Sequence, residues 1–491
     1  MGDPVEVELK LEFSAGGDAA LRAAEELGAA DDAAERHLVA TYFDTPAADL
    51  ERAGLSLRIR RDGRRHIQTL KAGGKAAGLF VRPEWDLPVR GWTPVLDDPG
   101  SPFAAMLDPA WIERIGPAFT TDVHRHRRRF GFDGARIECA IDTGRVDSGA
   151  HSDTVAELEL ELLDGDAAAL FALARALDRH APLRLGVLSK AERGYRLLDL
   201  AAGAGAAVRG EPIRLGAETD ARGAFAAILT ACLRHYRLNE ALILAADGDE
   251  LIHQARVALR RLRSAFTLFK PLFGDDADAA RLRGELRWLA GELGSVRDID
   301  VLIPRVDAAA QALLRAERAR RFSGLRAALD LSRARALPLD LVEWMALGRW
   351  RDAAELQAVQ HAPAREFAEA VLAKRFRSVR RKGRDLVGLD DEHRHRVRID
   401  AKKLRYAADF FASCFGGDEA AAQRHAAFVK ALARLQDKLG ELNDVAMGAE
   451  LLAGLGITAT LAPEGAPRDK VLGKAAKAFD RLIDTPRFWK D

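Results

Sequence analysis

Charged and apolar residues alternate strictly over residues 5–13, near the start of the chain. In an extended strand, alternate side chains point to opposite faces, so the charged residues share one face and the apolar residues share the other. The charged positions are Glu6, Glu8, Lys10 and Glu12. Three carboxylates and a lysine are costly to bury without partners. The pattern therefore predicts a strand whose charged face binds cations and anions together, as a metal-phosphate site does.

At least six strands up to about residue 163 show the same alternation. Beyond the first, the charged faces carry Arg58 and Arg60; Arg82, Glu84 and Asp86; Arg125, Arg127 and Arg129; Glu138 and Asp142; and Glu157, Glu159 and Glu161. A single strand of this kind is typical of a solvated outer face. Because the pattern repeats, with acids and bases in comparable number, we expect a closed antiparallel barrel with a polar lumen. Closure also removes the exposed strand edges.

Net charge divides the chain into an acidic and a basic part. At 491 residues the chain is too long for one ordinary hydrophobic core, so two or more domains are expected. Residues 1–221 carry a net charge of −9 and the remainder +10, which gives the overall +1. Small residues are frequent over 203–216 and indicate a linker. We predict domains over 1–202 and 221–491 joined by a linker over 203–220, with a polyanion as partner of the second domain.

The cysteines and the apolar segments indicate the compartment. Cys139, Cys232 and Cys414 lie far apart, and no cysteine or histidine has zinc-site spacing, which favours a reducing cytoplasm. The chain begins without the basic and apolar regions of a secretory signal. No stretch reaches the roughly 20 apolar residues that a membrane crossing needs. We therefore expect a cytoplasmic protein without a membrane partner.

Several short motifs follow one another over about residues 3–200. They are Glu6-x-Glu8-x-Lys10, Tyr42-Phe43-Asp44-Thr45, Leu57-Arg58-Ile59-Arg60, Thr69-Leu70-Lys71, the Glu157/Glu159/Glu161 strand and Ser189-Lys190-x-x-Arg193-Gly194-Tyr195. One Glu-x-Glu-x-Lys motif is a weak signal, but the ordered set resembles the CYTH family, also called triphosphate tunnel metalloenzymes. The resemblance implies an eight-stranded antiparallel β tunnel with flanking helices, which holds a triphosphate.

The resemblance also implies roles for the charged residues of the tunnel. The bases that would grip phosphate oxygens are Lys10, Arg58, Arg60, Lys71, Arg125, Arg127, Lys190 and Arg193. The cofactor would be Mg²⁺ or Mn²⁺, hard ions that prefer carboxylate oxygen, held by Glu6, Glu8, Glu157, Glu159 and Glu161. Catalysis would centre on Glu6, Glu8, Lys10 and Lys71. The alternation leaves open which arginine of Arg125, Arg127 and Arg129 takes the family position.

From residue 221 onward the apolar pattern takes a helical period, and one part of it is duplicated. His253 is followed by Arg256, Arg260, Arg261 and Arg263, and His395 is followed at the same offsets by Arg398, Lys402, Lys403 and Arg405. Downstream, residues 293–298 parallel residues 439–444. Offsets of three, seven and ten residues fall on one helix face. Each copy therefore predicts a stripe of basic residues on one helix face, which suits an anionic ligand. The alternatives are a solvated basic face or a set of structural salt bridges.

These stripes, with Arg297-Asp298-Ile299-Asp300-Val301, resemble the CHAD domain over about residues 221–487. The resemblance implies an all-α domain of two pseudo-symmetric four-helix bundles whose stripes face a shared groove. It implies inorganic polyphosphate as partner, bound by both stripes and Arg297, and association with polyphosphate granules. The second copy has Asn443 in place of Arg297 and Ala446 in place of Asp300, so the two halves are not equal contributors.

Together the resemblances imply a metal-dependent inorganic triphosphatase that hydrolyses tripolyphosphate to pyrophosphate and phosphate and is tethered to polyphosphate. A thiamine triphosphatase or an adenylate cyclase would need a pocket for its organic group; Trp85 and Trp92 fit core or lid packing better than ring stacking. A non-catalytic polyphosphate-binding protein is the alternative of another class, although the acids of the tunnel motifs are all present. Nucleic-acid binding is the least favoured, because no reader motif or aromatic platform occurs.

Overall fold

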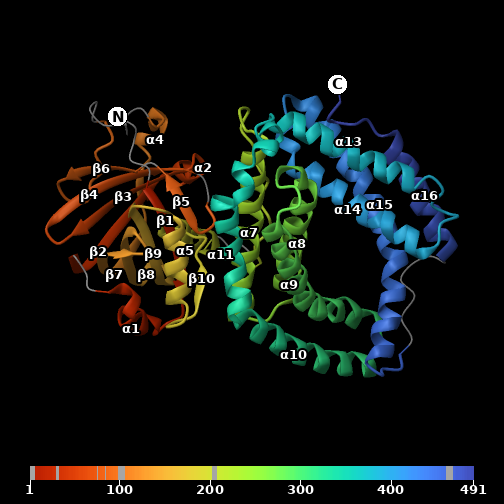
Figure 1. Cartoon of the computed structure of the whole chain (residues 1–491), viewed down its shortest axis with the longest axis horizontal. Coiled ribbons are helices and arrows are strands. Elements are labelled where there is room, and N and C mark those ends of the chain that lie inside the picture. The colour runs from red at the N-terminus through yellow and green to blue at the C-terminus, as the bar shows by residue number, and fades with distance from the viewer. Residues whose placement is uncertain are drawn as a thin grey trace. The chain divides into compact units, whose positions relative to one another are not determined.

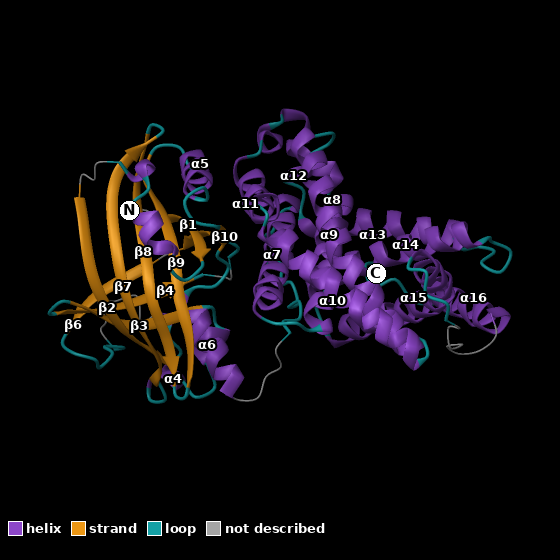
Figure 2. Cartoon of the chain, turned by 90° about the horizontal axis from the view of Figure 1, so that it is seen from below, coloured by secondary structure: helices purple, strands orange, loops and turns teal. Residues whose placement is uncertain are grey.

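The computed structural model describes residues 6–28, 32–73, 76–82, 84–97, 106–201, 207–459 and 468–490, with the side chains of Glu6, residues 80–82, Ala201 and residues 443–447 left aside. The chain divides into two compact units. The first unit comprises residues 1–206 and 330–347, and the second comprises residues 207–329 and 348–491. Figure 1 follows the chain through both units, and Figure 2 shows that the strands belong to the first.

The first unit is built on one antiparallel sheet. Its strands are β1 (Glu6–Phe13), β2 (Asp32–Asp44), β3 (Leu55–Asp62), β4 (Arg65–Ala72), β5 (Leu79–Arg82), β6 (Glu84–Val89), β7 (Gly116–Phe132), β8 (Ala135–Ser148), β9 (His151–Asp164) and β10 (Leu183–Leu185). Hydrogen bonding runs in the order β10-β1-β9-β8-β7-β2-β3-β4-β6, and β5 pairs with β1. The antiparallel sheet is as predicted.

The expected number of eight strands requires a correction, and closure of the sheet into a barrel stays a prediction. The described strands form an open path of nine, with β5 as a tenth strand outside that path. The number eight came from the family resemblance. Alternation could not reveal β10, with three residues, or β5, with four, because both are too short for the pattern to be visible. The predicted strand at 82–86 falls on two assigned strands, β5 and β6, and residue 83 between them lies outside the described residues.

Alternation gives the sheet a charged face and an apolar face, as the sequence predicted. On the apolar face, Leu9 of β1 and Leu160 of β9 are fully buried, and helix α5 (Ala168–Leu177) packs against both strands. Strands β3 and β4 form a hairpin, since they pair up to Asp62 and Arg65. Gly63 has a φ of 61°, a conformation that favours glycine in such a turn. Trp85 packs against the core cluster around Leu57 and Leu70, as expected for a core residue.

Helix α6 (Lys190–Ala201) packs on the charged face of the sheet, against the apolar residues that lie next to the charged ones. Its Tyr195 and Leu197 pack with Val123 of β7 and Val146 of β8. The Tyr195 hydroxyl donates a hydrogen bond of 2.7 Å to Asp44, the last residue of β2. This packing fixes the start of α6, and therefore Lys190 and Arg193, over the sheet. The other helices of this part of the chain are α1 (Gly17–Arg22), α2 (Asp49–Arg52) and α4 (Pro109–Ile112).

The second half of the chain is helical, as predicted. Its helices are α7 (Ala221–Ala245), α8 (Asp249–Leu268), α9 (Ala277–Leu302), α10 (Ala308–Asp330), α11 (Ser332–Leu347), α12 (Gln357–Gln360), α13 (Ala364–Lys382), α14 (Asp391–Phe410), α15 (Glu419–Gly454) and α16 (Arg468–Asp484). Aspartates cap four of them: Asp220, Asp276, Asp390 and Asp418 each accept a hydrogen bond from a backbone N–H of the first turn. Such a cap contributes about 1 kcal/mol.

The two basic stripes lie on α8 and α14, which are helices over the whole of both repeats. Their grouping into two four-helix bundles stays a prediction, as do the domain boundaries at 202 and 221. None of the helices that the structure describes combines the length and apolarity needed to cross a membrane.

Helix α11 belongs to the first unit although it follows α10 in the chain. It packs against α5 and β10 (Figure 1). Arg335 of α11 donates two hydrogen bonds to the Asp178 carboxylate, at 3.0 and 2.8 Å. Arg175 of α5 pairs with Asp340 at 2.8 Å and also with Glu343. A helix from the basic half of the sequence thereby completes the first unit.

Candidate functional site

The register of the sheet brings acids and bases of distant strands together. Lys10 of β1 lies opposite Glu159 of β9, and Glu8 lies opposite Glu161. Glu159 in turn lies opposite Ala140 of β8, whose neighbour on the same face is Asp142. Because these residues share one face of the sheet, their side chains meet.

Three carboxylates form the acidic centre of the charged face. Ligand oxygens of Asp142, Glu157 and Glu159 all lie within 4.8 Å of one another. The side chains of Asp142 and Glu157 are fully buried, and that of Glu159 is 13% exposed. The prediction included Glu157 and Glu159 but not Asp142, although Asp142 shares a face with Glu138 in the alternation of β8. Glu161 is half-buried and lies outside this cluster.

Two lysines hold the acidic centre together. The Lys10 Nζ is 3.0 Å from Glu157 and also bonds Glu159; the Lys190 Nζ is 2.7 Å from Glu157, 2.8 Å from Glu159 and 2.8 Å from Asp142. Burial lowers the pKa of Lys10, but Glu157 and Glu159 outweigh it, so the pKa is raised above its usual range. The pKa of Lys190 is likewise raised, against the effect of burial, by Asp142, Glu157 and Glu159. Both ammonium groups therefore keep their charge at neutral pH.

Two arginines complete this network of charges. Arg125 donates two hydrogen bonds of 2.7 Å to Asp142 and one to Glu159. Arg193 of α6 bonds Glu157 at 3.0 Å and Glu12 at 2.6 Å. The pKa of Glu157 is lowered because Lys10, Lys190 and Arg193 outweigh the opposing effect of its burial. Each acid of the centre thus contacts more than one cation.

The structure distinguishes the three arginines on the charged face of β7. Arg125 is part of the acidic centre, whereas Arg127 pairs with Asp32 at 2.6 Å and with Glu138 at 3.5 Å. Arg129 also bonds Glu138, at 2.6 Å. Arg127, a predicted substrate contact, is therefore grouped with a different set of acids from Arg125.

Across the charged face, Arg58, Arg60 and Lys71 form a second basic group. Lys71 pairs with Glu84 of β6, and Arg58 lies 3.7 Å from the same carboxylate. The positive charge of Arg60 is balanced less well by nearby acids. The Arg58 charge, followed by burial, lowers its pKa to about 10, and its Nε has no hydrogen-bond partner among the described residues. An excess of positive charge at Arg58 and Arg60 is what an anionic ligand would neutralise.

The carboxylates of the charged face fit a hard divalent cation. Glu8 is 7% exposed, and its Oε1 is a buried oxygen without a hydrogen-bond partner among the described residues. The Lys10 Nζ lies 3.8 Å from that oxygen, beyond hydrogen-bond distance. With the cluster of Asp142, Glu157 and Glu159, this gives an all-oxygen set of donors of the kind that Mg²⁺ and Mn²⁺ prefer. The Glu6 side chain, another predicted ligand, lies outside the described residues.

In the second unit, the stripes of α8 and α14 lie side by side. Their helices contact each other, and Arg260 of α8 donates a hydrogen bond of 3.1 Å to the Tyr406 hydroxyl of α14. The Arg261 guanidinium lies over the Phe410 ring, 5.5 Å from its centre. The structure therefore brings the two predicted stripes together.

Acidic residues lie beside several bases of this surface. Arg256 pairs with Asp298 at 2.9 Å, Arg297 lies 4.0 Å from Asp249, and Lys403 lies 3.9 Å from Asp400. The remaining stripe residues are His253, Arg263, His395, Arg398, Lys402 and Arg405; Arg263 and His395 are exposed and the others are half-buried.

Two bases of α9 add to this surface. Burial, followed by the charges of Arg287 and Arg283, lowers the pKa of Arg263. Arg283 also lowers the pKa of Lys403 on α14, after burial and other neighbours. Arg283 and Arg287 were not among the predicted binding residues, although their spacing of four residues places them on one helix face.

Comparisons with known proteins agree with this two-part architecture. The CYTH domain model matches residues 5–195 and the CHAD domain model matches residues 227–453. An inorganic triphosphatase of Haemophilus influenzae is 31% identical over 169 residues, which are 32% of this chain and 45% of that protein. An uncharacterized protein of Mycobacterium tuberculosis is 29% identical over 413 residues, 76% of this chain and 75% of that protein. The chain thus spans less than half the length of the first relative.

Two solved structures resemble parts of the chain. The match to the CHAD domain of Ricinus communis covers 58% of this chain and 93% of that structure's chain, with 28% identity and a TM-score of 0.45. A Hippeastrum protein, described as an adenylyl cyclase candidate with a dominant triphosphatase activity, covers 38% and 92%, with 16% identity and a TM-score of 0.27. From the matches of the two family models, the chain contains a CYTH domain followed by a CHAD domain.

Proposed function

We propose that the chain is a metal-dependent inorganic triphosphatase, which adds water to tripolyphosphate and releases pyrophosphate and phosphate, and whose helical unit binds inorganic polyphosphate. The observation that carries the first part is the close grouping of Asp142, Glu157 and Glu159 with Lys10, Lys190 and Arg125 on one face of the sheet. Buried acids and bases in one place suit a ligand that arrives as a metal-phosphate complex.

The proposed site is a tunnel. Two pairings support this: β6 pairs with β4, and β5, which ends just before β6, pairs with β1 at the other side of the sheet. If β5 and β6 continue each other, the path from β1 to β4 would be joined back to β1. In such a cylinder the charged face would be the lumen, where water is limited and electrostatic interactions are strong.

Each group of residues has a distinct part in the proposed reaction. Arg58, Arg60 and Lys71 would bind one part of the triphosphate, and Lys10, Arg125, Lys190 and Arg193 another, with Arg127 towards Glu138. These cations would neutralise the charge that develops on the transferred phosphoryl group, so no covalent nucleophile is needed. Glu6, Glu8, Asp142, Glu157, Glu159 and Glu161 would hold Mg²⁺ or Mn²⁺, which when bound adds positive charge against the phosphate oxygens. A carboxylate released from its lysine partner would accept the proton of the attacking water.

For the helical unit, we propose that inorganic polyphosphate lies along α8 and α14. The hydrogen bond between Arg260 and Tyr406 and the added bases of α9 support one continuous basic surface. A flexible polyanion gains from many weak contacts on such a surface, because each one raises the local concentration of the next phosphate.

The first experiment measures phosphate release by the full chain from tripolyphosphate, ATP and thiamine triphosphate, with Mg²⁺, with Mn²⁺ and with a chelator. The test variant is Glu8→Gln, which keeps the shape of the side chain, and the control is Glu25→Gln, an exposed acid of the same unit. We expect tripolyphosphate to be the best substrate, with release at least about 100-fold slower in Glu8→Gln and unchanged in the control.

Other results would select an alternative. Faster release from thiamine triphosphate or ATP would indicate an organic triphosphatase. No release from any substrate, with polyphosphate still bound, would contradict the enzyme proposal and leave a binding protein.

A further inference from the structure

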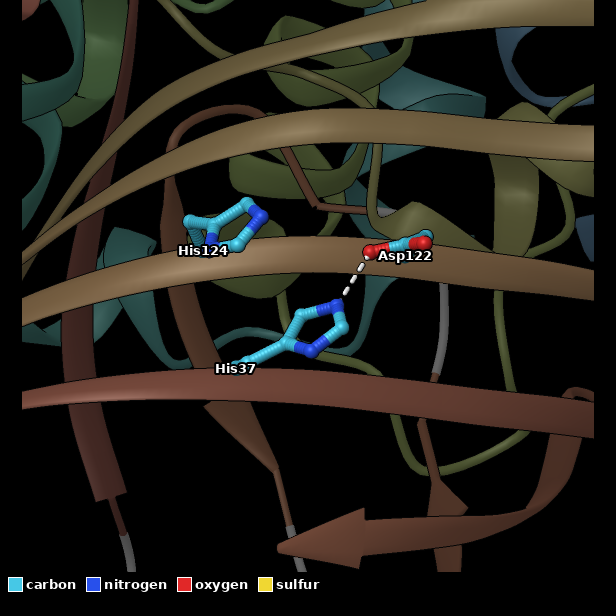
Figure 3. Close-up of side chains that lie close together, drawn as sticks. All are labelled: His37, Asp122 and His124. Atoms are coloured by element: carbon cyan, nitrogen blue, oxygen red, sulfur yellow. Dashed lines mark hydrogen bonds and ion pairs between the residues drawn. The ribbon is translucent and has the colours of Figure 1, made fainter.

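Two histidines and an aspartate meet on the face of the sheet opposite the charged face. His37 of β2 and His124 of β7 lie directly opposite each other in the register, and Asp122 precedes His124 by two residues. Alternation places all three on the side away from Arg125, the neighbour of His124 that bonds Asp142. Figure 3 shows the three side chains together on the two strands.

The geometry of this cluster is that of neighbouring ligands. The His37 Nε2 is 2.6 Å from the Asp122 Oδ1, and the two imidazole rings are stacked, with centres 4.5 Å apart and planes at 8° (Figure 3). One ligand atom from each residue lies within 4.8 Å of the other two. Ligands of one tetrahedral ion lie about 3.4 Å apart, for bonds of about 2.1 Å. The ligand atoms must therefore move closer together, and the rings must leave their stacked arrangement to turn their nitrogen lone pairs to a common point.

Exposure makes this rearrangement cheap. The side chains of His37 and Asp122 are 47% and 41% exposed, and His124 is also exposed, so rotation about their side-chain bonds meets little resistance. The backbone of β2 and β7, by contrast, is paired over their whole shared length. A rigid sheet therefore carries three mobile ligands at fixed Cα positions.

An open cavity of about 420 Å³ adjoins the cluster. It is lined by Arg22, Glu35, Arg36, His37, His124, Arg125 and Thr143. Alternation directs the side chains of Arg36 and Arg125 to the other face of the sheet, and all three arginines have acidic partners. Their partners are Glu35 at 3.3 Å from Arg22, Asp62 beside Arg36, and Asp142 at 2.7 Å from Arg125. The cavity leaves room for water in the remaining coordination positions.

We propose that His37, Asp122 and His124 bind a borderline divalent transition metal, of which Zn²⁺ is the reference case. Two imidazoles and one carboxylate are a common ligand set for such ions, with open positions left for water. This set includes nitrogen ligands, whereas the carboxylates of the charged face offer only oxygen ligands, which suit hard ions. The two sites would therefore select different metals from the same solution. This inference is independent of the proposed phosphohydrolase activity.

The test uses Cu²⁺ and Zn²⁺ on the full chain in a large excess of Mg²⁺. Electron paramagnetic resonance of bound Cu²⁺ reports directly whether imidazole nitrogens are ligands, a signature that the interior carboxylates cannot give. Zn²⁺ affinity is measured by isothermal titration. The variant is His37→Ala/His124→Ala, and the matched control is His126→Ala, the next histidine on the same face of β7.

We expect the wild-type chain to show coupling to two nitrogens and the double variant to lose it. Zn²⁺ binding at this site should weaken at least about 100-fold in the double variant and stay unchanged in the control, since loss of outer-sphere partners alone costs 10–100-fold. Hydrolysis of tripolyphosphate with Mg²⁺ should be the same in all three proteins.

Absence of nitrogen coupling in the wild-type chain, or equal Zn²⁺ affinity in the double variant, would overturn the proposal. If the double variant does not fold, Asp122→Asn replaces it, because this change keeps the shape of an exposed side chain. The expected loss of Zn²⁺ affinity is then about 10-fold, and an unchanged affinity would again refute the site.

Discussion

The charged face of the sheet and the stripes of the helical unit both gather bases, but they balance them differently. On the sheet, Lys10 and Lys190 are buried and each contacts several carboxylates. On the helices, Arg263 is exposed. After partial burial, the charges that lower its pKa are those of two further arginines, Arg287 and Arg283. Buried charges require partners, whereas exposed ones are screened by water.

This difference matches the ligands that we propose. A short triphosphate with its metal must displace existing ion pairs, so it is selected by the fit of several buried groups at once. A long polyphosphate reaches stripes that are exposed or half-buried, and it binds by the sum of its contacts. Three experiments test this contrast, in order of decreasing expected effect.

The largest effect is expected from Glu157→Gln. This change removes one charge from a fully buried carboxylate that contacts Lys10, Lys190 and Arg193, and leaves those cations undercompensated. We expect the free energy of unfolding to fall by about 3–5 kcal/mol and hydrolysis to fall at least about 100-fold. Urea denaturation and phosphate release measure the two quantities. A loss of less than about 1 kcal/mol would mean that the buried cations of the charged face do not need this carboxylate. The sheet and the helices would then not differ in how they balance charge.

The next prediction concerns pH and compares the two units. In the helical unit, burial, followed by the charge of Arg261, lowers the pKa of His235 from 6.5 to about 4. Between these values the unfolded chain binds a proton that the folded chain does not, so stability falls as the pH falls. The acids Glu157 and Glu159 have lowered pKa values, so their contribution is fully present above about pH 4.5 and is lost only below it.

From pH 6.5 to 4.5 the helical unit should therefore lose up to about 2.7 kcal/mol, while these acids cost the first unit nothing. His235→Gln should remove most of this slope, because glutamine does not titrate and can still bond Gln254, the partner of His235 at 3.2 Å. Denaturation followed at several pH values measures the effect. An equal slope in the wild-type chain and the variant would show that His235 is not the group responsible.

A smaller effect, on binding alone, is expected from Arg263→Gln. Removing this base takes a positive charge away from Arg283 and Arg287, so stability should change by less than about 0.5 kcal/mol. Affinity for polyphosphate should fall about 10-fold at low salt, and less at high salt. The control is Arg320→Gln on α10, an exposed arginine that pairs with Glu317. If Arg263→Gln destabilised the chain as Glu157→Gln does, the stripe would be a structural network.

The sequence predicted these regions to different depths. The alternation of β1 and β9 identified Lys10, Glu157 and Glu159, because the face of a strand is a local property. Asp142 was missed, since its role depends on the register of β8 against β9, which no local pattern records. The duplicated stripes were predicted as helices, but Arg283 of α9 contributes through packing between helices. The predicted domain over residues 221–491 stays a prediction, and the structure adds that residues 330–347 cluster with the first unit, which no local pattern in the sequence records.

The last prediction concerns that segment. Arg335 of α11 is 10% exposed and binds Asp178 through two hydrogen bonds, so α11 is tied to the β-sheet unit by a bidentate pair. Arg335→Gln removes one charge of this half-buried pair, and we expect the first unit to lose about 1–2 kcal/mol while the helical unit is unaffected. The control is Arg333→Gln, an exposed arginine of the same helix. Hydrogen exchange of β10 and α5, compared with that of α8, separates the two units in one experiment. Faster exchange in α8 as well would mean that α11 stabilises both units, and that hydrolysis and polyphosphate binding are linked through it.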